Sequence, residues 1–150
     1  MINVRKIVEF CLRHEDCIRR AIAEKRLDSG KANTTGGGGH CKISDPTAMQ
    51  AINNTASITC VEVEYGPAVA GQRRIMPLKK PIEWLKVTRW VQDYYDGKPQ
   101  GEILRMLYKE SQLRDDICKA LKISTATYYV ALNDVFTYAA GLARGLNIIR

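Results

Sequence analysis

From Pro81 onward the sequence is divided into helical segments by proline and glycine, and this punctuation constrains the fold more than any other feature. Pro81 opens a segment with helical spacing of apolar residues, and Gly97 ends it just before Pro99 opens the next. Two further helices are expected over residues 113–121 and 124–146. The residues expected to be buried in the first two helices are Trp84, Val87, Val91, Tyr94 and Tyr95, then Ile103, Leu104, Leu107 and Tyr108.

Residues 114–133, RDDICKALKISTATYYVALN, fit a helix-turn-helix. In this interpretation Ile123 lies in the turn and the hydroxyl group of Ser124 caps the second helix. Such a pair crosses steeply and leaves the start of its second helix free to enter the major groove of DNA. Lys122 departs from the pattern, because this corner often carries glycine. The expected buried residues are Ile117, Cys118 and Leu121, then Tyr128, Ala131, Leu132, Val135 and Tyr138 or Ala139.

The start of the second helix would form the DNA-binding surface. Short hydroxyl side chains reach phosphates, asparagine can bind adenine with two hydrogen bonds, and side-chain methyl groups can contact the methyl group of thymine. No Arg or Lys lies between Ser124 and Asn133, so a plain helical hairpin that binds no DNA is the structural alternative. The outward-facing candidates are Ser124, Thr125, Ala126, Tyr129, Val130 and Asn133, with Arg114, Lys119 and Lys122 flanking them to contact phosphates.

Residues 3–27 are predicted to form one long helix, although His14 and Glu15 interrupt its apolar stripe. Two interpretations of the stripe stay open: a coiled-coil seam between two subunits, or packing against the rest of the chain. The apolar positions are Val4, Ile7, Val8, Cys11, Ile18, Ala21 and Ile22.

The glycine-rich segment over residues 28–40 is expected to be a flexible linker. A phosphate-binding loop is not expected, because His40 and Cys41 follow the last glycine where the Walker motif requires Lys and Ser or Thr. Asp45 and Pro46 are expected to open a short helix that ends near residue 53.

A small β-hairpin is predicted between this linker and the helical region. The alternating pattern over residues 58–65 is typical of a strand and places Val61, Val63 and Tyr65 on one side. Residues 73–78 are expected to return as its partner. The sequence therefore predicts a mainly α-helical fold in three parts: 1–29, an N-terminal helix that can mediate oligomerisation; 30–80, the linker with a small helix and β element; and 81–150, a helix-turn-helix DNA-binding domain.

The charge balance favours a polyanionic partner. The chain has 23 Lys and Arg residues against 16 Asp and Glu residues, a net charge of +7. Positive charge favours nucleic acids, because each neutralised phosphate releases condensed counterions. A basic protein without a polyanionic partner is the alternative. The chain shows no membrane span and no secretory signal, so a cytoplasmic location is expected, with its scattered cysteines reduced.

Enzymatic and metal-binding roles find little support. His40, Cys41 and Cys60 supply three candidate ligands, but structural zinc takes four with paired spacing. Nothing fixes the geometry of His40 and Cys41 as a nucleophile and its base. Asp115 and Asp116 suit the positive end of a helix dipole. No catalytic residue, metal or cofactor is therefore expected.

Two pieces of the chain resemble the phage and prophage transcriptional regulators of the ArpU and RinA type, whose C-terminal part is similar to the promoter-reading region of sigma factors. The first is KPIEWLKV at residues 80–87, which leads into Tyr94 and Tyr95; the second is the helix-turn-helix with Ile123 and Ser124 at its corner. The SDPTA sequence at residues 44–48 behind the glycines is also similar. The resemblance implies an activator of late phage genes that acts with host RNA polymerase in the bacterial cytoplasm. Its DNA-contacting positions would be Ser124, Thr125, Thr127, Tyr129 and Asn133.

The leading hypothesis is a sequence-specific DNA-binding transcriptional regulator. Two alternatives stay open: a small terminase subunit for DNA packaging, which would form a ring of many copies, and an interaction module that binds polymerase or sigma factor without reading DNA. The segment over residues 60–78 has no counterpart in the resemblance, and its role stays open.

Overall fold

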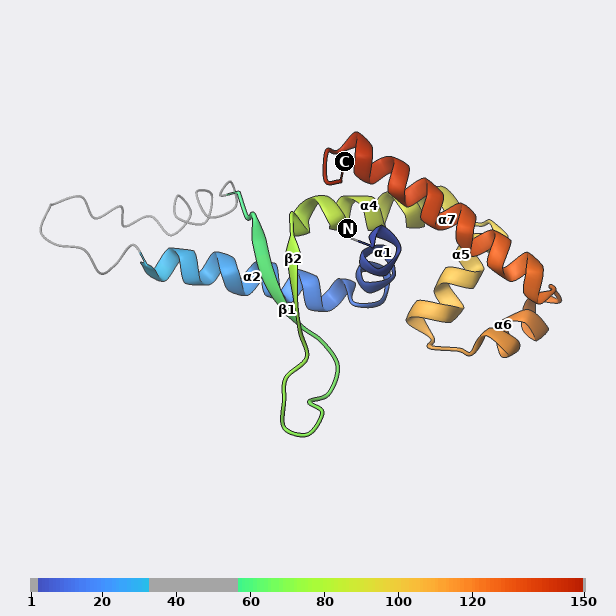
Figure 1. Cartoon of the computed structure of the whole chain (residues 1–150), viewed down its shortest axis with the longest axis horizontal. Coiled ribbons are helices and arrows are strands. Elements are labelled where there is room, and N and C mark those ends of the chain that lie inside the picture. The colour runs from blue at the N-terminus through green and yellow to red at the C-terminus, as the bar shows by residue number, and fades with distance from the viewer. Residues whose placement is uncertain (1–2, 33–56, 150) are drawn as a thin grey trace, which may run out of the picture. The chain divides into compact units, whose positions relative to one another are not determined.

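The computed structural model describes residues 3–32 and 57–149 and is mainly α-helical with one small β-hairpin, as the sequence predicts (Figure 1). The flexible linker expected over residues 28–40 is wrong at its start, because a helix continues to Ala32. The rest of that segment and the short helix expected from Asp45 lie outside the described residues. The helices and strands are α1 (Val4–Arg13), α2 (Glu15–Ala32), β1 (Cys60–Glu64), β2 (Ile75–Lys79), α4 (Pro81–Tyr95), α5 (Pro99–Leu104), a π-helix η1 (Arg105–Lys109), α6 (Arg114–Leu121) and α7 (Thr125–Gly145).

The structure groups the chain into two compact units. The first, the helical unit, comprises residues 1–15 and 83–150, and the second, the hairpin unit, comprises residues 16–82. The functional roles assigned above to residues 1–29, 30–80 and 81–150 stay predictions. Among the residues that the structure describes, no helix has the length and apolar character needed to span a bilayer.

The single helix predicted over residues 3–27 is wrong, because the chain breaks into α1 and α2 at His14. His14 leaves the helical conformation (φ −120°, ψ 32°), and its backbone N–H caps α1 by donating to the carbonyl oxygen of Phe10. The buried residues of the two helices, which belong to different units, are Val8, Cys11 and Leu12 in α1 and Ile18, Ala21 and Ile22 in α2. A single straight helix would bury its apolar residues along one continuous face. Here the buried residues of α1 and of α2 belong to two different compact units.

The apolar face of α1 packs within the chain, against α7 and η1. Arg5 adds a cation–π contact, with its guanidinium 4.7 Å from the ring centre of Phe136 on α7. This packing agrees with the interpretation that the apolar residues of the N-terminal segment pack against the rest of the chain. Self-association of the chain stays a prediction.

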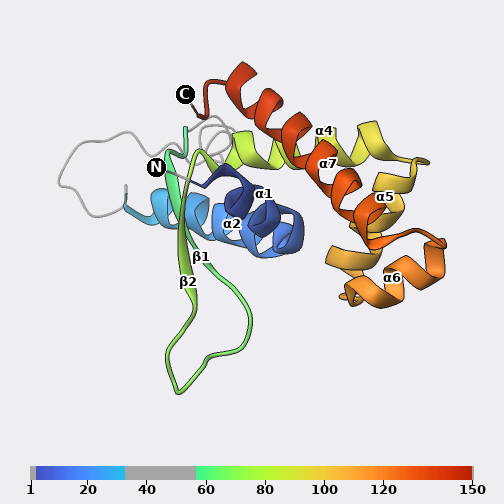
Figure 2. The same cartoon turned by 45° about the vertical axis from the view of Figure 1, so that its right-hand side comes forward.

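The hairpin unit has the strands where the alternation predicted them, paired antiparallel with Val61 opposite Leu78 and Val63 opposite Met76. Val61, Val63 and Leu78 are buried, whereas Tyr65, expected on the same side, is only half-buried. Two strands cannot bury an apolar face alone, and the buried face of α2 belongs to the same unit (Figure 2).

The helical unit is centred on α7, which contacts α1, α5 and α6. The prediction that Tyr94 is buried on α4 is wrong. Its side chain is 50% exposed and stacks on Tyr138 of α7, with ring centres 4.4 Å apart. Adjacent residues on a helix point about 100° apart, so Tyr95 takes the buried position and Tyr94 cannot. The buried residues of α7 are Tyr128, Ala131, Leu132, Val135, Phe136, Ala139 and Ala143.

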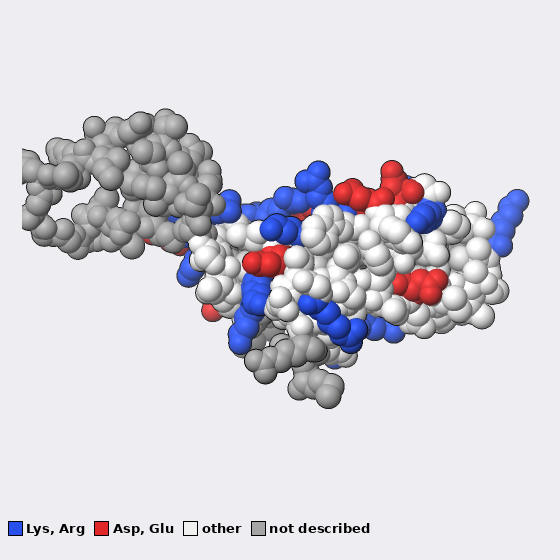
Figure 3. All heavy atoms as spheres, turned by 90° about the horizontal axis from the view of Figure 1, so that it is seen from above, with Lys and Arg blue, Asp and Glu red and all other residues white. Residues whose placement is uncertain are grey.

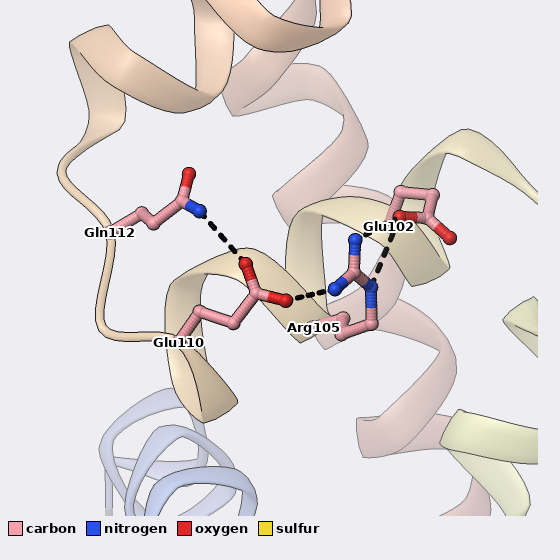
Figure 4. A network of polar contacts seen from close by, with 4 residues as sticks. All are labelled: Glu102, Arg105, Glu110 and Gln112. Atoms are coloured by element: carbon pink, nitrogen blue, oxygen red, sulfur yellow. Dashed lines mark hydrogen bonds and ion pairs between the residues drawn. The ribbon is translucent and has the colours of Figure 1, made fainter.

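The second expected helix ends in the π-helix η1 and a polar network that leads to α6. The Arg105 guanidinium lies 2.8 Å from a Glu102 carboxylate oxygen and also pairs with Glu110, which accepts a 2.8 Å hydrogen bond from Gln112 (Figure 4). Exposed ion pairs contribute little stability singly. Here they link α5 to the segment that leads into α6.

Candidate nucleic-acid interface

The corner between α6 and α7 is a Schellman turn centred on Lys122. The backbone N–H of Ile123 donates to the carbonyl oxygen of Cys118 at 3.0 Å, and that of Lys122 donates to Lys119 at 3.3 Å. Lys122 adopts the left-handed conformation, with φ 54° and ψ 42°, which explains why this corner often carries glycine. On the inner side of α6, Ile117 is fully buried, whereas Cys118 and Leu121 are half-buried.

Ser124 begins α7 as its N-cap, as the sequence predicts. Its Oγ accepts the backbone N–H of Thr127 at 3.1 Å and lies 2.8 Å from the Thr127 Oγ1. The cap therefore uses the hydroxyl groups of both residues locally. Thr125 is exposed, and its hydroxyl group takes no part in this cap.

The first three turns of α7 have one buried and one exposed face. Every candidate proposed for the outward face is exposed, with Val130 at 60% and Tyr129 at 44%. The inward residues Tyr128, Ala131, Leu132, Val135 and Ala139 are buried, and Tyr138 is half-buried. The side chains of this surface are Ser124, Thr125, Ala126, Thr127, Tyr129, Val130 and Asn133, hereafter the α7 outer face.

Arg114 joins the two helices through its side chain. The Arg114 Nη1 donates to the Tyr129 hydroxyl oxygen at 3.2 Å, and the Nε donates to the Asp115 carboxylate at 2.9 Å. These two hydrogen bonds raise the pKa of Arg114, so its charge is fixed. This contact fixes the orientation of the Arg114 guanidinium, which the sequence predicts only to lie beside the outward-facing residues of the second helix.

The contact between Arg114 and Tyr129 is the feature that sequence reasoning missed. Both residues were candidates, but they are 15 positions apart, and helical periodicity predicts contacts only three or four residues apart. The exposed apolar Leu113, 72% accessible at the N-cap of α6, was also missed.

Two lysines border the α7 outer face. Lys119 and Lys122 are exposed, and neither has an ion pair among the residues that the structure describes. Asp115 and Asp116 offset part of this charge. On the face drawn in Figure 3, Lys and Arg side chains are interspersed with Asp and Glu side chains and uncharged surface.

The structure brings together no metal site in its described part, where no three His, Cys, Asp or Glu side chains form a ligand cluster. His40 and Cys41 lie outside the described residues. Cys60 is a free, half-buried thiol on β1.

A family model described as a protein of unknown function (DUF1492) matches residues 79–139. The match begins at the last residue of β2 and ends at Ala139, so it includes α4, α5, η1, α6, the turn and most of α7. It covers less than half of the chain. The searches of curated proteins and of solved structures found no match. The chain is thus similar to this family over the region that contains the candidate interface.

Replacing Lys122 with glycine is expected to raise the free energy of unfolding of the helical unit by up to about 1 kcal/mol, because glycine adopts the left-handed conformation without steric cost. The matched change Lys119→Gly lies within α6 and should lower it by about 1 kcal/mol. Urea unfolding followed by tryptophan fluorescence measures both, since Trp84 and Trp90 lie in the helical unit. A loss of stability in both variants would contradict the strain at Lys122.

Proposed function

We propose that this chain is a sequence-specific DNA-binding protein that inserts the start of α7 into the major groove and regulates transcription. The supporting observation is the two-faced geometry of α7, whose outer face is exposed while its inner face is packed in the core. An α-helix with its side chains is about 10–12 Å wide and the major groove about 12 Å wide, so one such face can enter it.

Electrostatic attraction would come from cations around the α7 outer face. Lys119 and Lys122 are free to neutralise phosphates, and Arg114 is held beside Tyr129. Phosphate contacts fix the position of a protein on the duplex, whereas base contacts provide the sequence information. With few cations, non-specific affinity is expected to be modest and discrimination to depend on base contacts.

The regulatory part of the proposal rests on the resemblance to phage regulators of the ArpU and RinA type. In that role the protein binds near a promoter in the bacterial cytoplasm and acts with host RNA polymerase, without catalysis or a cofactor. In vitro transcription with bacterial polymerase, on a template that carries a selected binding site, tests this role. A protein that binds duplex DNA but leaves transcript yield unchanged would remove the regulatory part.

The double variant Thr125→Ala with Asn133→Ala is expected to weaken binding to a selected duplex by about tenfold or more and binding to a scrambled duplex little. Both side chains are exposed, so the fold should persist. The contrasting variant Lys119→Gln should weaken binding to both duplexes alike. It should also reduce the slope of log affinity against log salt concentration by about one, as expected for the loss of one phosphate contact. Fluorescence anisotropy over a salt series measures these affinities. Equal losses on both duplexes for the double variant contradict base reading, and absence of binding at low salt contradicts the proposed function.

A further inference from the structure

The α7 outer face includes exposed apolar side chains near its centre. Val130 is 60% exposed and Tyr129 44%, and Ala126 is exposed one turn before Val130. Helical geometry places Ala126, Val130 and Asn133 within an arc of roughly 60°. The centre of this face therefore presents methyl groups with one carboxamide beside them.

Groups that recognise guanine are absent from the same arc. Arg and Lys make the commonest specific contact to guanine, and the sequence has neither between Ser124 and Asn133. Arg114 is engaged by Tyr129 and Asp115, whereas Lys119 and Lys122 precede α7. These three cations thus lie at the margin of the α7 outer face, where the proposed function places the DNA phosphates.

Cytosine would require a carboxylate acceptor, and Asp134 is the nearest candidate. The charge of Asp134 contributes to raising the pKa of Tyr95 on α4, after the larger effect of burial. Asp134 is exposed and lies about 80° around the helix from Ala126, between Val130 and Tyr138, which stacks on Tyr94 of α4. It therefore lies next to Val130, about 40° beyond the arc that Ala126, Val130 and Asn133 share, on the side toward α4.

We infer, resting on the proposed function, that the base pairs under the centre of the α7 outer face are A·T pairs. The methyl groups of Ala126 and Val130 contact thymine methyl groups in the major groove, and the Asn133 carboxamide binds adenine through N6 and N7. The thymine methyl group is the one apolar group that base pairs expose in that groove, so it matches this surface chemically.

Replacement of thymine by deoxyuridine tests the inference, because it removes the methyl group and keeps the pairing. The full chain is first used to select duplexes from a randomised library, and the selected duplex is then synthesised with deoxyuridine at single core positions. Affinity should fall roughly three- to fivefold for each contacted thymine. This factor corresponds to the transfer free energy of one methyl group from water to an apolar contact. Deoxyuridine at flanking positions should change nothing.

Val130→Ala provides the second measurement, since it shortens the contacting side chain on an exposed surface. The variant should bind the thymine duplex more weakly and discriminate less between thymine and deoxyuridine. Selection of a G·C-rich core, or equal binding of thymine and deoxyuridine duplexes by the unaltered protein, overturns the inference while the proposed function stands. Absence of binding to any duplex at low salt overturns the proposed function itself and the inference with it.

Discussion

Replacing Gly101 with alanine is expected to lower the free energy of unfolding of the helical unit by about 3 kcal/mol. Gly101 lies in α5, where an added Cβ would overlap the carbonyl oxygen of Tyr95 and lie 2.9 Å from the Tyr95 carbonyl carbon. These are backbone atoms at the end of α4, and the Tyr95 oxygen also accepts the N–H of Lys98 at 3.0 Å. The obstacle cannot rotate away like a flexible side chain, so α5 must move from α4.

Gly141→Ala is the matched control, because it makes the same chemical change at a helical position with open space. Apart from its chain neighbours and the nearby backbone of its own helix, no heavy atom lies within 4 Å of its added Cβ, and Gly141 is exposed on α7. Alanine should raise stability there by about 0.8 kcal/mol through helix propensity. Urea unfolding monitored by tryptophan fluorescence compares the two variants. If Gly101→Ala is as stable as the unaltered protein, the close approach of α4 and α5 is wrong.

Val130→Glu is expected to weaken binding to a selected duplex by roughly 100-fold or more while it leaves the fold intact. Val130 lies at the centre of the α7 outer face and is 60% exposed, so a longer polar side chain remains in solvent in the free protein. In the complex the added carboxylate would lie in the major groove between phosphates and lose its hydration. Repulsion and desolvation therefore act together in the bound state alone.

Val130→Gln separates charge from shape, because glutamine has the size of glutamate without its charge. Its loss should stay below about tenfold, and added salt should reduce the difference between the two variants, since salt screens the repulsion. Anisotropy measures binding, and urea unfolding should give stabilities within about 0.5 kcal/mol of the unaltered protein. If Val130→Glu binds as tightly as the unaltered protein, α7 does not enter the groove through this face.

Helix and strand boundaries were largely readable from the sequence wherever a local signal sets them. Pro81 and Pro99 open α4 and α5, and the hydroxyl group of Ser124 opens α7, within a residue of the expected positions. These signals act through the backbone of their own turn, so no distant contact is needed to interpret them. The alternation of Val61 and Val63 likewise identified β1 and its buried face.

Tertiary packing determined the features that the sequence analysis missed. The apolar stripe on residues 3–27 predicts one helix, but its buried residues belong to two compact units and the chain breaks at His14. The sequence predicts that Tyr94 and Tyr95 are both buried, whereas in the structure only Tyr95 is buried. Tyr95 contacts the ring of Tyr138 on α7. Apolar character alone does not tell which of two neighbouring residues meets the core.

The sequence by itself determined which residues of α7 face outward, because helical periodicity and the Ser124 cap fix both the face and its start. Only the tertiary structure decided that Arg114 is held by Tyr129, that Lys122 turns the corner in a left-handed conformation, and that Gly101 meets the backbone of Tyr95. The physical reason is range. Capping and periodicity act within a few residues, whereas these contacts and the geometry of the corner depend on how whole helices pack.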